Sequence, residues 1–269
     1  MIKSIKNEKI KQLLKLSQYK KVRKAHNVFV LEGLRLINDA INFQAKLINL
    51  FLTERAIKNF QLKQINLDNY TVTTISEKVA AQISNVQHNQ GCFAICAQLN
   101  CLSLNSFSMK NGNFLLLLEI NNPGNLGTLF RSAAAFNFNN IILADCCEIY
   151  NPKTIRSSMS AIFKLKFVQC SVSAAKKWLK SCPLTSYAAV VSQDAESLTR
   201  LNTKKNGHVI VIGSEANGLN LEVTQLCTKK VTIKMQSKIE SLNVAVAGSI
   251  LMFHLSQKQQ IIQNNNNKK

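Results

Sequence analysis

The sequence predicts an α/β protein with two domains, the second of which contains a parallel sheet. Strand and helix patterns alternate along both halves of the chain, which is typical of the α/β class. Strands of the second half, such as "FLLLL" and "HVIVI", are continuously apolar, as expected of strands covered by helices on both faces. The polar, turn-rich residues 101–112 separate the halves and are expected to form a linker.

The first half, residues 1–100, is expected to form a small α/β domain. "VFVLEGLRLINDAI" predicts a strand followed by a helix, because Leu34, Ile37 and Ile41 recur at helical spacing. Ser76 is a good N-cap for a short helix in "EKVAAQIS". Further strands are predicted at residues 46–53, 70–76 and 92–99.

The second half, residues 113–258, restarts the alternation. Strands are predicted at residues 114–120, 141–144, 167–170, 187–192, 208–212 and 230–235. Helices are predicted at residues 125–138, 152–163, 173–180 and 241–257. Ligands of parallel sheets bind at the carboxyl ends of the strands, so the loops there are the places to look for chemistry. Residues 259–269 carry no core-forming pattern and are expected to be a disordered tail.

The charge of the chain favours a polyanionic partner, most simply a nucleic acid. It carries 34 Lys and Arg against 14 Asp and Glu, a formal net charge of +20. The alternative is a general drift of composition that only keeps the chain soluble. The sequence contains no apolar run long enough for a transmembrane helix and no pattern of a secretory signal, so we expect no membrane association and a cytoplasmic location.

Metal chemistry is not expected. The sequence has eight cysteines but no CxxC pair, and its four histidines are scattered. We interpret most of the cysteines as reduced thiols that behave as small apolar side chains.

Three loops after strands are candidates for a functional site. In "NNPGNLGTLFRSAAAF", Gly124 and Gly127 allow close backbone approach, and the following helix could attract a phosphate at its N-terminus. The loop matches neither GxxxxGK[ST] nor GxGxxG. In "VIGSEANGLN", Glu215 is either a site residue or an acid at the start of the helix beginning near Leu221. In the third loop, "SKIESLNVAVAG", Ser241 is a good N-cap, with an amide from Asn243 in the first turn.

The residues of these loops favour group transfer by positioning. They include no His–carboxylate pair and no nucleophilic serine with a neighbouring base, so hydrolysis is poorly supported. Transfer onto a polyanion, guided by orientation, fits the polar residues that are present.

The three loops, in this order and spacing over about residues 112–256, resemble the three motifs of the SpoU/TrmH RNA 2'-O-ribose methyltransferases of the SPOUT class. "KKVRKAHNVFVLEG" is similar to the substrate-binding domain of many members, which resembles a ribosomal protein. The resemblance implies a trefoil-knotted parallel-sheet domain, S-adenosylmethionine as cofactor without a metal, and a homodimer. It implies that the cofactor is bound by Gly213, Gly218, Ile233, Met235 and Leu242.

The resemblance also implies a catalytic set and a substrate surface. The catalytic set is Asn125, Arg131, Glu215, Ser241 and Asn243. Within it, Asn125 and Glu215 would hold Arg131 and its loop in place, and Ser241 and Asn243 would order the cofactor loop. Because a guanidinium normally stays protonated, we favour a role for Arg131 in gripping the target phosphate and polarising the hydroxyl; action as the base is the alternative. The candidates for substrate binding are Lys20, Arg23, Lys24, Glu32, Lys153 and Arg156.

Three positions depart from the family pattern. Lys234 stands where proline is usual, and Asn27 and Ser160 stand where glycine is usual. The expected function is 2'-O-methylation of a ribose in ribosomal RNA. The alternatives are a transfer RNA methyltransferase, a non-catalytic RNA-binding or ribosome-assembly protein, and a phosphate-loop nucleotide enzyme.

Overall fold

The structure is a computed structural model that describes residues 1–107, 112–201, 207–236 and 240–266. The chain divides into two compact units. Unit 1 consists of Met1–Leu99 and Glu148–Phe163, and unit 2 consists of the remaining residues.

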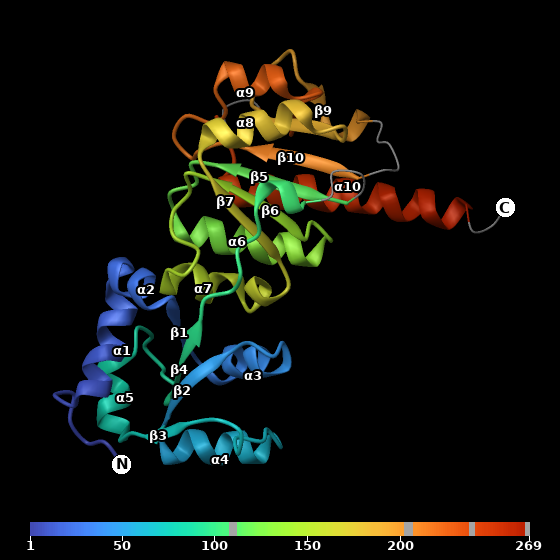
Figure 1. The fold of residues 1–269 in the computed structure, drawn as a ribbon. Helices are drawn as coiled ribbons and strands as arrows, with labels where there is room; N and C mark the ends of the chain where they lie inside the picture. Colours follow the sequence, from blue (N-terminus) through green and yellow to red (C-terminus); the bar gives the residue numbers. More distant parts are fainter. Residues whose placement is uncertain (108–111, 202–206, 237–239, 267–269) are drawn as a thin grey trace. The chain divides into compact units, whose positions relative to one another are not determined.

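Unit 1 is a four-stranded sheet with helices on both faces (Figure 1). Its elements are α1 (Glu8–Gln18), α2 (Lys20–His26), β1 (Val28–Glu32), α3 (Leu34–Asn42), β2 (Leu47–Leu52), α4 (Glu54–Leu62), β3 (Val72–Thr74), α5 (Glu77–Ile83), β4 (Cys92–Ala97), α7 (Pro152–Ser158) and η2 (Ala161–Phe163). The strand order is β1-β4-β2-β3; β4 is antiparallel to both of its neighbours, and β3 is parallel to β2. This confirms the predicted small α/β domain.

The amphipathic faces of α1 and α5 cover one side of this sheet. Leu13 and Leu16 of α1 are buried in one cluster with Val79 of α5 and Phe93 of β4. Ser76 is the predicted N-cap, since its Oγ accepts a hydrogen bond from the backbone N–H of Val79 at 3.3 Å. Sequence analysis did not predict α1, α2 or α4, although the helical spacing of Ile10, Leu13 and Leu16 in α1 is a signal that could have indicated it.

Residues 148–163 fold as part of unit 1, although they follow β6 in the sequence. Arg23 is 2% exposed and binds Glu148 through two hydrogen bonds of 2.6 and 2.7 Å. Tyr150 stacks on Phe29 with ring centroids 4.8 Å apart. Periodicity cannot reveal such long-range contacts, so the predicted division into continuous segments differs from the structure here.

Two of the three departures from the family pattern occupy left-handed backbone conformations. Asn27 ends α2 with φ 51°, and Ser160 has φ 70°. Glycine adopts such conformations without strain and asparagine tolerates them, which explains a glycine preference at both positions. Ser160 is buried, and its Oγ donates a 2.5 Å hydrogen bond to Asp39, which offsets part of its strain.

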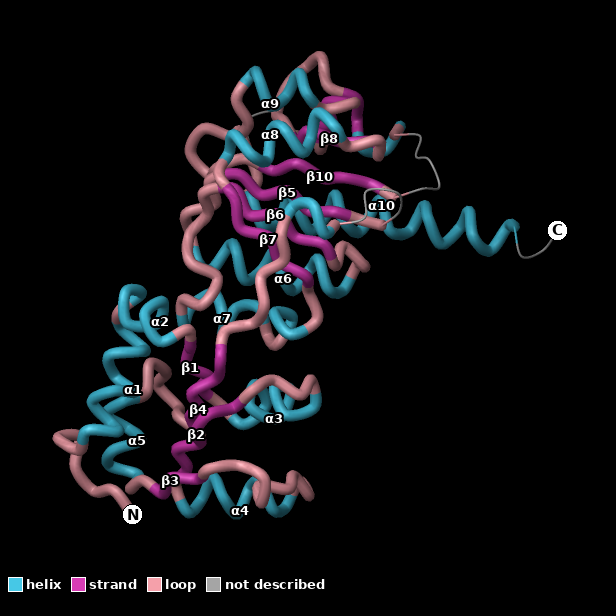
Figure 2. The backbone as a smooth tube through the Cα atoms, in the orientation of Figure 1, coloured by secondary structure: helices cyan, strands magenta, loops and turns pink. Residues whose placement is uncertain are grey.

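Unit 2 contains the predicted parallel sheet. Its elements are η1 (Leu104–Ser106), β5 (Phe114–Leu118), α6 (Pro123–Ala135), β6 (Asn140–Ala144), β7 (Lys166–Cys170), α8 (Val172–Ser181), β8 (Thr185–Ala189), β9 (Glu196–Ser197), η3 (Leu198–Arg200), β10 (His208–Ile212), α9 (Leu221–Leu226), β11 (Lys229–Thr232) and α10 (Val244–Asn266). The strand order is β7-β6-β5-β10-β8-β11-β9, and each neighbouring pair is parallel. Figure 2 shows β7, β6, β5 and β10 following one another in this sheet.

Helices cover both faces of this sheet, as its continuously apolar strands predict. Trp178 and Leu179 of α8 and Val223 of α9 pack on the face that carries Leu116 and Val211. On the opposite face lie α6 and α10 (Figure 1). A Cβ atom added to Gly248 of α10 would lie 2.5 Å from Leu129 and 2.7 Å from Ile212, so the lack of a side chain there lets α10 pack closely against α6 and β10.

The predictions for the linker and for the C-terminal tail differ from the structure. The expected linker at residues 101–112 is partly folded, since Leu102 donates a backbone hydrogen bond to Phe167 and Phe107 is buried in the core of unit 2; residues 108–111 lie outside the described part. The expected disordered tail at 259–269 is helical as far as Asn266, because α10 continues. No proline or glycine interrupts "QKQQIIQNNNN", so the helix has no local stop signal.

Candidate active site

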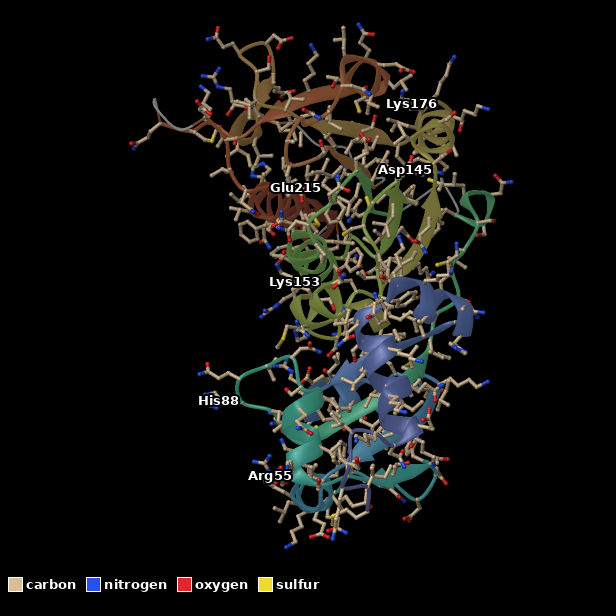
Figure 3. All side chains as sticks on the ribbon, turned by 90° about the vertical axis from the view of Figure 1, so that its left-hand side faces the viewer. Arg55, His88, Asp145, Lys153, Lys176 and Glu215 are labelled. Atoms are coloured by element: carbon tan, nitrogen blue, oxygen red, sulfur yellow. The ribbon has the colours of Figure 1, made fainter. Side chains whose placement is uncertain are left out.

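The carboxylate of Glu215, in the loop after β10, holds the loop after β5. It accepts hydrogen bonds from the backbone N–H groups of Asn121 and Asn122, both at 3.1 Å, and from Nδ2 of Asn125 at 3.0 Å (Figure 3 shows Glu215). Glu215 does not cap the next helix, because Asn220 does so by accepting from Val223 N. The structural alternative for Glu215, an acid at the start of α9, is therefore wrong.

Asn243 connects the third loop to the first two. Its Nδ2 donates to Oδ1 of Asn125 at 3.1 Å, and its Oδ1 accepts from the backbone N–H groups of Ala245 and Val246. Asn243 is thus the N-cap of α10. The prediction that Ser241 caps this helix is wrong: α10 begins three residues later, and Ser241 is exposed.

One continuous chain of hydrogen bonds therefore joins the three loops. It runs from the N-terminus of α10 through Asn243 and Asn125 to Glu215 and the backbone after β5. Both ends of the Asn125 amide are used within the protein. Asn125 therefore connects the loops and sets their positions.

The first loop is not a phosphate cradle. Asn122 caps α6 by accepting from the backbone N–H groups of Gly124 and Asn125, at 2.8 and 3.4 Å. The carboxylate of Glu215 already supplies the negative charge that this helix N-terminus attracts. Sequence analysis missed Asn122, although an asparagine directly before a proline at the first helical position is a recognisable helix start.

These hydrogen bonds also set the charge of Glu215. Partial burial by itself raises the pKa of its carboxyl, but the hydrogen bonds from Asn125 and from the backbone of Asn121 and Asn122 outweigh it and lower the pKa below 4.5. Glu215 is therefore a carboxylate at neutral pH.

Replacing Glu215 with glutamine is expected to loosen the loop after β5. A Gln side chain keeps one acceptor oxygen. Its NH₂ group, however, would face a backbone N–H donor that binds a carboxylate oxygen in the wild type. Hydrogen exchange of the Asn121 and Asn122 amides should accelerate about tenfold, corresponding to about 1.4 kcal/mol. In the wild type the same protection should hold above the usual carboxyl pKa and be lost as the pH falls through the lowered pKa of Glu215.

The matched control is Glu222→Gln. Glu222 is an exposed acid on α9 that pairs with Lys176. If both variants protect the two amides as the wild type does, Glu215 does not anchor this loop.

The loop after β10 is a tight turn that requires glycine. Ser214 and Gly218 pair across it, and the Gly218 N–H donates to the Ser214 carbonyl at 3.0 Å. A Cβ atom on Gly213 would lie 2.0 Å from the Gly218 carbonyl oxygen. Gly218 has φ 62° and nothing within 4 Å of its own missing Cβ, so its outer side is open to a ligand.

The remaining predicted site residues of unit 2 lie on α6 and in the segment between β11 and α10. Ile233, Met235 and Leu242 are half-buried in the segment between β11 and α10, and Lys234 between them is exposed. Arg131 lies on the exposed side of α6 and makes no hydrogen bond or ion pair with any described residue. Its guanidinium is available to a ligand.

Three of the six predicted substrate-binding residues, all in unit 1, are exposed. Lys20 and Lys24 are exposed on α2, and Lys153 is exposed on α7 (Figure 3); Arg156 is half-buried on the same helix. Arg23, in contrast, is buried and uses its donors on Glu148 and on the carbonyls of Leu16 and Ser17. The prediction that Arg23 contacts RNA is wrong.

Glu32, also expected to bind substrate, ends β1. Its carboxylate accepts from Ser84 Oγ at 2.5 Å and from the backbone of Asn85 at 3.4 Å, which fastens the loop after α5.

The described residues contain no cluster of His, Cys, Asp and Glu that would hold a metal ion. Among the same residues, no helix is both long and apolar enough to cross a membrane.

The parallel sheet and the hydrogen-bonded loops at its carboxyl edge define an α/β protein whose site is built from three separate strand–helix junctions. The chain belongs to the SpoU rRNA Methylase family, which residues 112–253 match, and residues 7–94 match the MRM3-like substrate binding domain. This is the family that the order of the motifs predicts, and the three loops of the site lie within its matched segment.

The similarity to known proteins extends over nearly the whole chain. The chain is 25% identical over 256 residues to the 23S rRNA (guanosine(2553)-2'-O)-methyltransferase RlmP of Bacillus subtilis, covering 94% of this chain and 98% of the relative. The crystal structure of the AdoMet-bound rRNA methyltransferase from Sinorhizobium meliloti is similar with a TM-score of 0.84 at 24% identity, covering 96% and 97% of the chains. An RNA 2'-O ribose methyltransferase structure has a TM-score of 0.82 at 26% identity, covering 97% and 99%.

Proposed function

We propose that this protein transfers a methyl group from S-adenosylmethionine to a ribose 2'-hydroxyl of ribosomal RNA. The observation that carries the proposal is the hydrogen-bond chain Asn243–Asn125–Glu215, which draws the three family motifs into one site. The RlmP relative supports ribosomal RNA as the substrate, and the net charge of +20 supports a polyanion.

The residues after β10 and β11 fit the proposed cofactor. An open turn at Gly218 gives access to backbone groups, and the half-buried side chains of Ile233, Met235 and Leu242 between β11 and α10 offer apolar surface. Such a combination suits a ligand with an adenine ring and polar ends. When bound, S-adenosylmethionine supplies an already activated methyl group on a sulfonium.

The reaction requires orientation and the removal of one proton. In this transfer the 2'-oxygen would take the methyl group from the sulfonium, which would become a neutral thioether, and the hydroxyl proton would pass to solvent water. We assign Arg131 to the RNA: its unpaired guanidinium would bind the phosphate next to the target ribose and polarise the hydroxyl. Asn125, Glu215 and Asn243 act as positioning residues. Ser241, exposed beside Leu242, would contact the cofactor or the RNA.

The proposal includes a homodimer. Val246 and Phe253 on α10 are 47% and 50% exposed, and Phe253 packs against Phe136 of α6 with ring centroids 5.6 Å apart. An exposed apolar strip on the helices next to the site suits contact with a second copy of the chain. We also propose the trefoil knot of the SPOUT class, since β10 lies between β5 and β8 and α10 returns to pack on α6.

The cysteines support a reducing compartment, which we take to be the cytoplasm. None of the eight forms a disulfide in the structure. Burial raises the pKa of Cys92 and Cys96 to about 12, so these two remain protonated and unreactive.

The decisive experiment incubates the purified protein with labelled S-adenosylmethionine and unmodified ribosomal or transfer RNA. Mass spectrometry of the digested RNA is expected to find one 2'-O-methylated nucleoside, and only in the ribosomal RNA. Methylation of transfer RNA alone would reassign the substrate. Tight RNA binding without any cofactor binding would favour the non-catalytic alternative.

A further inference from the structure

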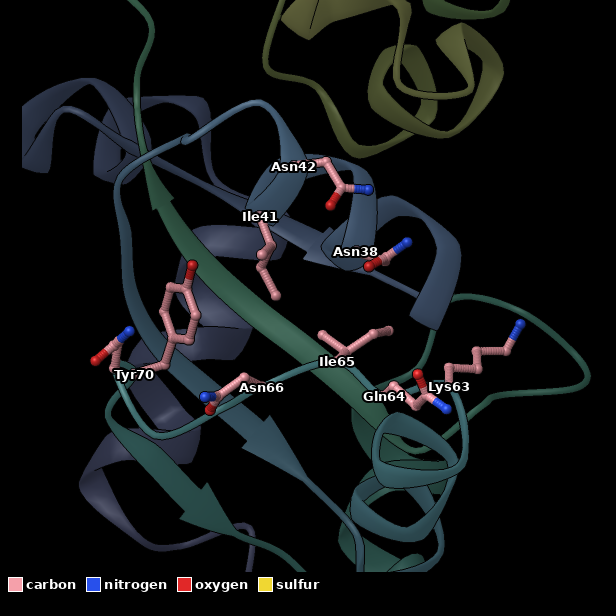
Figure 4. A pocket seen from close by; sticks show the side chains of 9 residues that line it. Asn38, Ile41, Asn42, Lys63, Gln64, Ile65, Asn66 and Tyr70 are labelled. Atoms are coloured by element: carbon pink, nitrogen blue, oxygen red, sulfur yellow. The ribbon is translucent and has the colours of Figure 1, made fainter.

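Unit 1 contains a pocket of about 640 Å³ that is not part of the site in unit 2. Its walls are the end of α3 and the segment that connects α4 to β3 (Figure 4). The nine lining residues are Asn38, Ile41, Asn42, Lys63, Gln64, Ile65, Asn66, Asn69 and Tyr70. This volume lies in the range of pockets that bind small organic groups.

We propose that this pocket binds an unpaired nucleobase of the RNA substrate; the inference rests on the proposed function. The first argument is the chemistry of the lining. Ile41, Ile65 and the ring of Tyr70 are half-buried and form an apolar floor, while the polar groups stand at the rim (Figure 4). An aromatic ring with aliphatic neighbours is a surface on which a base stacks.

The second argument is the set of polar groups without a partner. The side chains of Asn38, Asn42, Gln64 and Asn69 and the hydroxyl of Tyr70 make no hydrogen bond to any described residue. Amides both donate and accept, as does the edge of a nucleobase. A ligand with mixed donors and acceptors therefore matches this rim.

The third argument concerns charge and separates a base from a phosphate. The pocket lies at the carboxyl ends of α3 and α4, where helix carbonyls carry partial negative charge. These helix ends disfavour an anion inside the pocket but do not disfavour an uncharged base. No lining residue is acidic, and Lys63, exposed at the edge, is available to a backbone phosphate outside the pocket.

The wall after α4 is already formed. Gln64 takes a left-handed conformation with φ 55°, Asn66 Oδ1 accepts from the Asp68 N–H at 2.7 Å, and the Tyr70 N–H donates to the Leu67 carbonyl. A wall with its own hydrogen bonds loses little conformational entropy when a base enters.

The test measures binding of the full-length protein to two fluorescent RNAs, a hairpin with an unpaired loop and a blunt duplex of the same stem sequence. Tyr70→Leu is expected to weaken hairpin binding about five- to thirtyfold, the effect of losing one stacked base, and to leave duplex binding unchanged. Tyr70→Phe should retain hairpin affinity within about threefold, because it keeps the ring. A hairpin with 5-iodouridine in its loop should cross-link to Tyr70.

Asn42→Ala is the second variant, and Asn59→Ala is its control. Asn59 is an exposed amide on α4 outside the pocket. Only Asn42→Ala should weaken hairpin binding. Wild-type hairpin affinity in both Tyr70→Leu and Asn42→Ala, or equal losses for hairpin and duplex, would overturn the pocket assignment. Methyl transfer by the wild type is measured in parallel, so that failure of the pocket is distinguished from failure of the proposed function.

Discussion

Replacing Arg131 with alanine is expected to lower kcat for RNA methylation by about 100- to 1,000-fold, the range found when one group that stabilises developing charge is removed. The affinity for S-adenosylmethionine should change by less than about threefold, because Arg131 has no bond to the three loops. Single-turnover methyl transfer and cofactor titration by calorimetry measure the two quantities separately.

Two further variants test whether this effect is specific to Arg131 and to its guanidinium group. Arg200→Ala removes an exposed arginine of the same unit that is not part of the site, and it should leave kcat unchanged. Arg131→Lys keeps the charge but loses the planar fork, so a partial recovery would indicate that bidentate phosphate binding matters. Wild-type kcat in Arg131→Ala would remove this residue from the mechanism.

Replacing Gly213 with alanine is expected to abolish most cofactor binding, lowering the affinity for S-adenosylmethionine by at least about 100-fold. The new Cβ would lie 2.0 Å from the Gly218 carbonyl oxygen and 2.2 Å from its carbon, and backbone atoms cannot rotate away as a side chain does. The turn must open, which should also lower the free energy of unfolding by about 1–3 kcal/mol.

Gly218→Ala is a milder substitution in the same turn and serves as the comparison. Its Cβ would meet nothing within 4 Å, so only the strain of a φ of 62° remains, about 1–2 kcal/mol. Its cofactor affinity should therefore fall far less, by about tenfold. If Gly213→Ala binds the cofactor as tightly as the wild type, the turn after β10 is not part of the cofactor site.

Much of the fold could be predicted from local patterns. Continuous apolar runs such as Phe114–Leu118 identified the parallel strands, because only strands covered on both faces tolerate them. The same reasoning failed where contacts are long-range. Glu148 is adjacent to β6 in sequence, yet it pairs with Arg23 and its segment folds with unit 1. No periodicity carries that information.

For the site as well, some features could be predicted from the sequence and others could not. The order of its motifs was sufficient to predict the family and to single out Asn125, Glu215 and Asn243. Their partners were not predictable, since each hydrogen bond joins residues about 90 or more positions apart. The same limit explains two errors: Ser241 had the right residue type for an N-cap, and Arg23 the right charge for RNA, but burial and geometry decided both.

By itself, the sequence determined the class of fold, the family and the polyanionic character of the partner, because these depend on periodicity, motif order and composition. Only the tertiary structure decided that Glu215 fills the N-terminus of α6 and that Asn122 caps this helix, which excludes a phosphate there. It also decided which basic residues stay exposed. The physical reason is that hydrogen-bond partners and desolvation depend on distances in space, which the folded chain sets and local sequence does not encode.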